Sequence, residues 1–316
     1  MNPVLIHIGN TSCHITCSYQ IRTAISDLLS YEVEGSWFAR KKMPYWDGKI
    51  RHLSKDNTFP AGLYGLVVEF LKQKGVPVIT RDSRDVPAAS CAFKMTTEKT
   101  PRYYQVDARA TAKLHARGVY LMGVGAGKTF TAGMILEEHK VPTLFVVPDT
   151  GLRDQSLHDF KSWFGKNRVS DNVASDAPIV IANIQSLMNK DKKFFKRFKQ
   201  LMIDEFHHSA AKSYQKLNTW CSEAYYRYGF TGTFLRTDGS DMTMHGVLSN
   251  VIFKKSASEL IEEGFLVRPY ITIYRHTLPK MQLSYVQAYD YIVKDQEFNE
   301  LIAKIARKKI KERKQT

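Results

Sequence analysis

The sequence has few cysteines and no cysteine motif. Its four cysteines, Cys13, Cys17, Cys91 and Cys221, include no Cys-x-x-Cys pair, which argues against a disulfide scaffold or a zinc finger. Cys13, Ile15 and Cys17 alternate as one face of a strand does. We therefore interpret these cysteines as small buried side chains and not as metal ligands.

Long hydrophobic runs are also missing. No apolar segment approaches the roughly 18 residues of a membrane-spanning helix, and no basic segment precedes the N-terminal VLIHI as it would in a signal peptide. No internal repeat of fixed period is apparent. This pattern predicts a cytoplasmic protein with no membrane partner.

Acidic residues are in deficit. The sequence has 31 Asp and Glu against 46 Lys and Arg, which gives a formal charge of +15. This excess indicates a polyanionic partner, first of all nucleic acid, although a basic surface can also serve solubility alone. The 316 residues, 43% of them hydrophobic, are typical of a globular chain of two domains, with room for part of a third.

The most informative segment is VYLMGVGAGKT, from Val119 to Thr129. An apolar run that ends in alternating glycines and Gly-Lys-Thr predicts a buried strand, a phosphate-binding loop and a helix start. Lys128 would reach the β- and γ-phosphates, and the Thr129 hydroxyl would bind Mg²⁺, a hard cation. The loop backbone around the phosphates would come from Gly123, Gly125, Ala126 and Gly127. A tight glycine turn beside a chance lysine is the alternative.

Strand-like and helix-like segments alternate after this loop. The strands are expected at YLM, TLFVV, IVIA, LMI and Tyr228 to Thr231, which predicts an α/β fold with a parallel sheet flanked by helices. Before it, VLIHI, CHITC and Val76 to Thr80 as strands, with helices over Tyr19 to Leu29 and Tyr64 to Lys72, predict a small α+β domain. The polar TTEKTPR, Thr96 to Arg102, reads as the linker.

A second part of a nucleotide site follows the run LMI. Asp204 and Glu205 come directly after this buried strand, about 75 residues beyond the glycine loop. In a site for ATP and Mg²⁺, Asp204 would hold the metal and Glu205 would orient and deprotonate the attacking water. Acidic residues after a strand also occur as charges at a helix N-terminus, but the pairing with the loop favours the catalytic interpretation.

The order of motifs resembles a known family. PRYYQ, GVGAGKT, VVPDTGLRDQ, ANIQSL, DEFH and GFTGTFLRTDG resemble the motor of superfamily 2 helicases from about Pro101 to Pro269, with DEFH where DEAH or DExH is usual. The Arg-x-Asp-Gly after the third motif and the N-terminal segment PYWDGKIRHLSKDNTFPAGLYGLVVEFLKQKG are similar to UvsW-type helicases of tailed bacteriophages. The resemblance implies a RecA-like fold, ATP and Mg²⁺ as cofactors, DNA as partner, a monomer, and the host cytoplasm for a phage-encoded chain. RNA stays open as a partner.

The resemblance also implies roles around the nucleotide. Gln105 matches the glutamine that reads the adenine edge, and Arg102 and Tyr104 would help to enclose the base. A capped helix start with two packed tyrosines is the alternative for PRYYQ. Coupling between hydrolysis and strand movement is implied for His207, Thr231 and Thr233. Phe206 and Gly232 depart from the family pattern, which has a small residue and an alanine at these positions, without removing a catalytic atom.

Two groups of residues are candidates for contact with nucleic acid. The motor resemblance implies phosphate contacts at Thr150, Arg153 and Gln185, although a capped helix after Asp149 explains the first of these loops equally well. In the N-terminal domain cations interleave with aromatics, a mixture that grips phosphates and stacks bases. These residues are Arg40, Lys41, Lys42, Trp46, Lys49 and Arg51. A solvated basic hairpin with Trp46 packed inward is the alternative.

We predict three segments: an accessory DNA-binding domain over 1–98, a RecA-like ATPase lobe over 99–267, and the start of a second lobe over 268–316. The last segment should hold a strand at Tyr270 to Arg275 and a long helix from Met281 to Lys314. The family's later motifs, with arginines that contact the γ-phosphate, are not found after Pro269. We therefore expect a fragment with weak turnover.

The expected function is an ATP-dependent DNA helicase or translocase that remodels branched replication or recombination intermediates, as the resemblance implies. The motor of a restriction system or a repair translocase of XPB type shares these motifs. From another class, a nucleic-acid-binding module could keep a phosphate loop that does not hydrolyse. The intact Lys128, Thr129, Asp204 and Glu205 argue against that decay.

Overall fold

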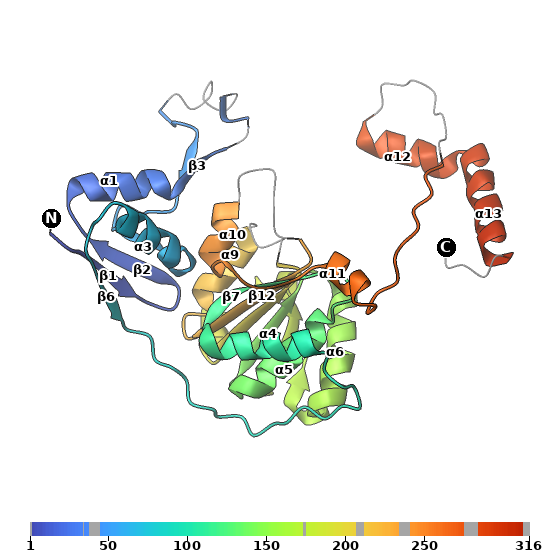
Figure 1. Cartoon of the computed structure of the whole chain (residues 1–316), viewed down its shortest axis with the longest axis horizontal. Helices are drawn as coiled ribbons and strands as arrows, with labels where there is room; N and C mark the ends of the chain where they lie inside the picture. Colours follow the sequence, from blue (N-terminus) through green and yellow to red (C-terminus); the bar gives the residue numbers. More distant parts are fainter. Residues whose placement is uncertain are drawn as a thin grey trace. The chain divides into compact units, whose positions relative to one another are not determined.

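The computed structural model describes residues 2–33, 35–37, 45–172, 175–206, 212–233, 241–274 and 284–311. The chain forms two compact units, Met1–Val267 and Arg268–Thr316 (Figure 1). The larger unit holds both of the sheets that the sequence predicts. The finer boundary near residue 98 stays a prediction.

The first part of the larger unit is a small α+β layer. A four-stranded sheet has the order β5-β2-β1-β6, and β3 and β4 pair separately. Val4, Ile6 and Ile8 alternate with more exposed residues along β1, and the buried side packs on Ile25 of α1 and Val67 of α3. This alternation is the signal that predicts the sheet. The elements are β1 (Val4–Ile8), β2 (Ser12–Thr16), α1 (Tyr19–Leu28), β3 (Ser30–Glu32), β4 (Lys49–Arg51), β5 (Thr58–Pro60), η1 (Ala61–Leu63), α3 (Tyr64–Gln73) and β6 (Val78–Asp82).

The second part is a seven-stranded sheet of order β13-β7-β12-β11-β8-β10-β9. All of its strand pairs are parallel, so the predicted α/β fold is confirmed. The elements are α4 (Tyr103–Leu114), β7 (Arg117–Met122), α5 (Lys128–His139), β8 (Thr143–Val147), α6 (Thr150–Phe164), η2 (Lys166–Arg168), β9 (Val169–Ser170), β10 (Ile179–Asn183), α7 (Ile184–Leu187), α8 (Lys192–Phe195), β11 (Gln200–Asp204), α9 (Lys212–Trp220), β12 (Tyr226–Thr231), α10 (Asp241–Val247), β13 (Val251–Lys255) and α11 (Ala257–Glu262).

The sheet divides the core into two layers because successive strand residues face opposite sides. On one side Tyr120 and Phe145 pack with residues of α4, α5 and α6. On the other side Leu144 and Ile203 pack with residues of α7, α9 and α10. Helices thus cover both faces (Figure 1). Both faces are apolar, and this explains why the strands read as continuous hydrophobic runs.

Within the same unit, the α+β layer contacts the part of the chain that forms the larger sheet. The Asn10 side chain donates a hydrogen bond to the Ser222 carbonyl (3.0 Å), and Arg117 donates to the Asn10 carbonyl (2.6 Å). Gly62 of η1 lies so close to α10 that a Cβ atom there would be 2.0 Å from the His245 carbonyl oxygen. Only glycine permits this approach. The α+β layer therefore packs beside the helix that follows the third motif.

The smaller unit differs from the sequence prediction in two ways. No strand forms over 270–274, where Tyr270 is 94% exposed. A strand needs a partner to pair its backbone, and the described part of this unit offers helices alone. The expected long helix is two helices, α12 (Tyr285–Lys294) and α13 (Gln296–Lys311). Asp295 interrupts it because its carboxylate accepts a hydrogen bond from the Phe298 N–H (2.7 Å), as an N-cap does.

The segment Lys190 to Lys199 contains six cations and three phenylalanines. Phe195 and Phe198 are fully buried, although the helix itself, α8, covers only four residues. Among the helices of the described residues, none is both long and apolar enough for a membrane crossing.

Candidate functional site

The glycine loop joins the end of β7 to the start of α5. Gly125 and Gly127 have φ of +80° and +79°, a left-handed conformation that favours glycine. A Cβ at Gly127 would lie 2.5 Å from the Gln105 amide nitrogen, and one at Gly123 would lie 2.6 Å from the Ala257 backbone nitrogen. A side chain at Gly123 or Gly127 would therefore clash with its neighbours. The loop runs directly into the helix N-terminus at Lys128, where partial positive charge favours an anion.

The two acids meet this loop at the same edge of the sheet. The Lys128 Nζ lies 3.4 Å from a Glu205 carboxylate oxygen. The Glu205 N–H donates a hydrogen bond to the Asp204 carboxylate (3.0 Å), and Glu205 has a φ of +47°. That strained conformation in a non-glycine residue is typical of functional sites. The structure thus brings together the lysine and the acid pair that the sequence singles out.

Asp204 has a perturbed acidity. Burial, followed by the charge of Glu205, raises the pKa of the Asp204 carboxyl to about 6, and the nearby Lys128 lowers it. The folded protein therefore holds this proton up to about pH 6, whereas the unfolded chain loses it near pH 4. Ionisation of Asp204 therefore lowers the free energy of unfolding as the pH rises from about 4 to about 6. A cation bound at Asp204 offsets this cost, which is the chemistry of a metal ligand.

The third motif lies between the other two. β12 is the neighbour of both β7 and β11, and the turn after it carries Gly232. A Cβ there would lie 3.9 Å from the Lys128 Nζ and 3.6 Å from the Met122 carbonyl, so the family's alanine would fit in ordinary contact. The Thr231 hydroxyl donates to the Thr233 carbonyl (2.6 Å) and accepts from the Thr233 N–H (3.3 Å). His207 lies outside the described residues.

The residues expected at the base are joined to the loop by hydrogen bonds. The Tyr104 hydroxyl and the Gln105 amide both donate to the Ala126 carbonyl (3.1 and 3.0 Å). The Gln105 amide oxygen also accepts from the Arg102 N–H (2.9 Å). One amide hydrogen and one oxygen lone pair of Gln105 are left for another partner. The capped helix start is therefore present, Gln105 is only 5% exposed, and base recognition by Gln105 stays a prediction.

The donor set fits a nucleotide with Mg²⁺. Thr129 and Asp204 offer a hydroxyl and a carboxylate, the oxygen ligands that Mg²⁺ takes, and Lys128 with the helix N-terminus suits phosphate. When bound, Mg²⁺ would neutralise charge on the phosphate oxygens. The assignments of Arg102, Tyr104, Gln105, Thr129 and the loop glycines as ligands stay predictions.

The expected phosphate contacts lie at the same sheet edge, on the other half. Val147, before α6, is in register with Asn183, before α7, so the first turns of these helices, which carry Thr150 and Gln185, follow neighbouring strands. Asp149 caps α6 by accepting from the Leu152 N–H (2.9 Å). Arg153 donates two hydrogen bonds to its neighbour Asp154. Thr150 and Gln185 are exposed.

The aromatic and basic hairpin is described in part. Arg40, Lys41 and Lys42 lie outside the described residues. Lys49 and Arg51 lie on β4 and are exposed; the indole N–H of Trp46, which is half-buried, donates to the Lys49 carbonyl (3.0 Å). Arg51 pairs with Asp47. Lys49 is therefore more available than Arg51 for contact with an anion.

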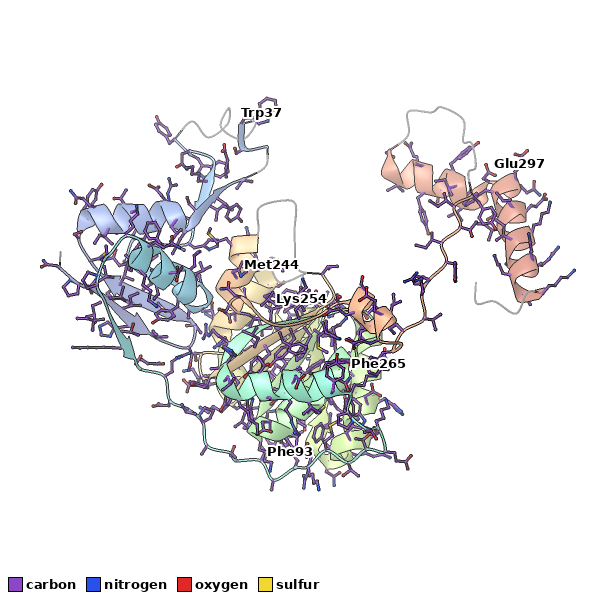
Figure 2. All side chains as sticks on the ribbon, viewed as in Figure 1. Trp37, Phe93, Met244, Lys254, Phe265 and Glu297 are labelled. Atoms are coloured by element: carbon purple, nitrogen blue, oxygen red, sulfur yellow. The ribbon has the colours of Figure 1, made fainter. Side chains whose placement is uncertain are left out.

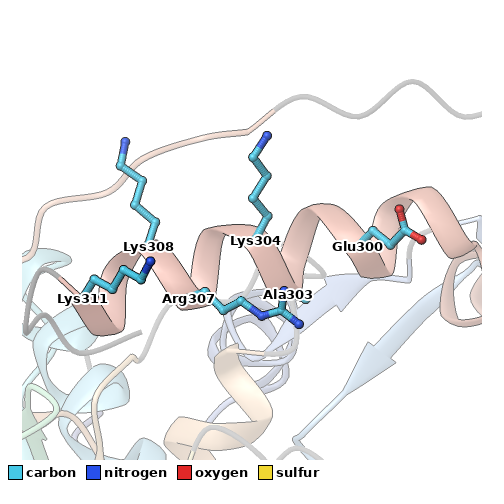
Figure 3. A pocket seen from close by; sticks show the side chains of 6 residues that line it. All are labelled: Glu300, Ala303, Lys304, Arg307, Lys308 and Lys311. Carbon is cyan, nitrogen blue, oxygen red and sulfur yellow. The ribbon is translucent and has the colours of Figure 1, made fainter.

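A further basic face lies on α13 (Figure 3). Residues three and four apart share one face of a helix, and here the spacing collects four cations beside Glu300 and Ala303. These are Lys304, Arg307, Lys308 and Lys311. Lys304 and Lys308, one turn apart, point to the same side of α13 (Figure 3).

Sequence reasoning missed the contacts that the chain after β13 makes with α4. Lys255 of β13 donates to the Tyr103 hydroxyl (2.9 Å) and to the Glu263 carboxylate (2.6 Å). Phe265 packs against Tyr103 and Tyr104. Local sequence offers only the Gly-Phe-Leu that follows the helix start, and this tripeptide does not predict a contact with residues more than 150 positions away.

Two family models match the chain. The family described as "DNA helicase UvsW, N-terminal" matches residues 6–80. The family described as "Type III restriction enzyme, res subunit" matches residues 98–236. The first match covers the α+β layer, and the second covers the glycine loop, the acid pair and the third motif.

Individual relatives agree with these matches. The chain is 24% identical over 290 residues to the ATP-dependent DNA helicase uvsW of Enterobacteria phage T4, with 83% of this chain and 58% of the relative covered. It is 28% identical over 174 residues to the DNA 3'-5' translocase XPB2 of Sulfurisphaera tokodaii, with 54% and 39% covered. The chain thus spans about half the length of these relatives. A crystal structure of the UvsW helicase from bacteriophage T4 has a TM-score of 0.70 and 22% identity, with 80% of this chain and all of that chain covered.

The parallel sheet, with the glycine loop and the acid pair on its carboxyl edge, has a RecA-like fold, and the sequence matches make the chain similar to the superfamily 2 helicase class. Within that class the chain is UvsW-like, because the α+β layer and the lobe both match, in the order that UvsW has.

Proposed function

We propose that the chain is the nucleotide-binding part of an ATP-dependent DNA helicase or translocase that remodels branched replication or recombination intermediates. One observation carries the proposal: Lys128 of the glycine loop and Glu205 of the acid pair lie 3.4 Å apart, although they come from strands that are not neighbours. The match to a phage helicase in both parts of the larger unit supports the choice of DNA.

The proposal gives each residue a task in hydrolysis. Lys128 and the N–H groups of the glycine loop would hold the β- and γ-phosphates. Thr129 and Asp204 would hold Mg²⁺, and Glu205 would orient a water and take its proton. In the described conformation Glu205 pairs with Lys128. A γ-phosphate that draws Lys128 away would break this pair.

Hydrolysis tests this assignment. Glu205→Gln removes the base and keeps the side-chain shape, so we expect binding of MgATP within about threefold of the parent and cleavage about a hundredfold slower or more. Cleavage should be followed with protein in excess over ATP, so that one turnover suffices. The matched control is Glu223→Gln, an exposed glutamate paired with Lys199, which should cleave at the parental rate. Equal rates for the parent and Glu205→Gln would refute the role.

A motor of a restriction or repair system is the second candidate. The restriction-subunit model over residues 98–236 and the similarity to a 3'-5' translocase favour it. It shares the nucleotide site, so the two candidates differ in their DNA substrate. Preference for forked or four-way DNA over linear duplex in a competition assay supports the first, and equal affinity supports the second.

DNA binding should depend on salt. We propose that the chain neutralises about five phosphates of DNA, which gives a slope of about −4 to −5 in log affinity against log salt, and that α13 by itself supplies part of this contact. The double change Lys304→Ala with Lys308→Ala on α13 should reduce the steepness by about 2. Lys294→Ala, which removes a cation already paired with Asp290, is the control and should change the slope least. A slope that stays the same in the double variant would show that α13 does not contact DNA.

A further inference from the structure

The segment that follows α11 folds back onto the nucleotide loop. Gly264 has a φ of +77°, and the N–H groups of Phe265 and Leu266 both donate to the Leu260 carbonyl (2.8 and 3.0 Å). This is a glycine-dependent helix C-cap, which fixes the direction of the chain after the helix. Leu266 then lies so close to the loop that a Cβ at Gly125 would be 2.6 Å from its side chain.

Phe265 is the aromatic residue of this segment (labelled in Figure 2). The guanidinium of Arg102 lies over its ring, 4.9 Å from the centroid, and the Tyr104 ring meets it edge to face at 5.8 Å. Arg102 also donates hydrogen bonds to the Tyr104 hydroxyl (2.9 Å) and the Gly125 carbonyl (3.3 Å). Stacking and hydrogen bonding together fix the plane of the guanidinium.

The segment is held in place from a second direction. The Glu263 carboxylate accepts from the Tyr103 hydroxyl (2.8 Å) and from Lys255 (2.6 Å), and the Lys255 side chain is only 7% exposed. These bonds join the end of α11 to the first turn of α4 and to β13. Phe265 therefore lies on a segment anchored on both sides, next to the helix turn that carries Gln105.

We propose that Phe265 positions the adenine base of the nucleotide. It holds Arg102 flat beside the loop, so that the purine stacks against the Arg102 and Phe265 pair, with its edge toward the helix turn that carries Gln105. Arg102 and Phe265 are both half-buried, which leaves part of the pair accessible to a ligand. The inference rests on the proposed nucleotide site and adds a determinant from a distant part of the chain.

A purely structural role predicts something different. If Phe265 served only to pack α11, its loss would loosen the loop and weaken every phosphate ligand alike. A positioning role for the base predicts a loss confined to ligands that carry the base. Comparing MgADP with magnesium pyrophosphate separates the two, because pyrophosphate occupies the loop without a base.

The test is a calorimetric titration of three variants with both ligands. Phe265→Leu keeps apolar bulk and removes the planar ring, so we expect MgADP affinity to fall about tenfold, within the range that base stacking contributes, while pyrophosphate affinity stays within twofold. Phe265→Tyr should restore MgADP binding. Val267→Ala, on the same segment and 91% exposed, is the matched control and should bind as the parent does.

The outcomes are distinct. Parental MgADP affinity in Phe265→Leu would overturn this inference and leave the nucleotide site standing. An equal loss for MgADP and pyrophosphate would assign Phe265 a packing role and also overturn it. A parent protein that binds neither ligand would overturn the nucleotide site and this inference together.

Discussion

Replacing Lys128 with alanine is expected to weaken nucleotide binding by about thirtyfold or more, because the change removes a charged hydrogen bond to phosphate worth about 2 kcal/mol. Lys128 is 13% exposed and directly faces Glu205. Its loss also leaves the carboxylates of Asp204 and Glu205 without this cation, so an incoming phosphate meets net repulsion. MgADP and pyrophosphate should both be affected, in contrast to the variants at Phe265.

Lys113→Ala is the matched control for this experiment. Lys113 lies on α4, is 56% exposed and pairs with Glu138, so its removal changes the net charge equally without touching the loop. Titration of a fluorescent derivative of ADP with the two variants should show a loss in the first alone. Parental affinity in Lys128→Ala would mean that the glycine loop is not where the nucleotide binds.

Gly229→Ala is expected to destabilise the larger unit by about 1 to 3 kcal/mol, the usual cost of overpacking a core. A Cβ at Gly229 of β12 would lie 2.6 Å from the Phe206 ring and 2.5 Å from Leu248, and both side chains are fully buried. Phe206 stands where the family has a small residue, and the missing side chain at Gly229 is what makes room for it.

The double variant tests this pairing. Phe206→Ala alone should cost about 3 to 5 kcal/mol through the cavity it leaves. With Gly229→Ala added, the new methyl group fills part of that cavity, so the combined loss should be smaller than the sum by about 1 kcal/mol or more. Urea unfolding of the single and double variants measures this coupling.

Gly65→Ala is the control for the glycine change. Gly65 lies in α3, and a methyl group added there would have no heavy atom of another part of the chain within 4 Å. The substitution should therefore be neutral or stabilising by up to about 1 kcal/mol. Additive losses at Phe206 and Gly229 would show that the two positions do not share one space.

The motifs of the nucleotide site could be predicted because each is local. The glycine loop and the acid pair are short segments whose strand, turn and helix signals lie within a dozen residues, and parallel strands bring their carboxyl ends to one edge. The order of the strands in the sheet is not predicted by such local signals. β13 pairs with β7, which lies more than 130 residues earlier in the sequence. The five residues of β13 contain no pattern that predicts this pairing.

The errors have the same physical origin. The segment 270–274 has the alternating apolar residues of a strand, yet pattern alone does not supply the partner that would pair its backbone. The break at Asp295 could have been predicted, since an aspartate before a helical pattern is a common N-cap. The role of Phe265 could not, because its partners Arg102 and Tyr104 lie at the other end of the lobe's sequence.

The position of β12 between β7 and β11 also sets a length. Two strand spacings of about 4.8 Å separate the backbone of the glycine loop from that of the acids. The two are therefore about 10 Å apart, and the turn at Gly232 lies between them. That backbone span suits a chain of phosphates with a cation at its far end, and the Lys128 side chain crosses it to reach Glu205. The distance between loop and acids would then be set by the backbone hydrogen bonds of the sheet. A preference for ligands of one length would therefore persist when a single side chain is replaced.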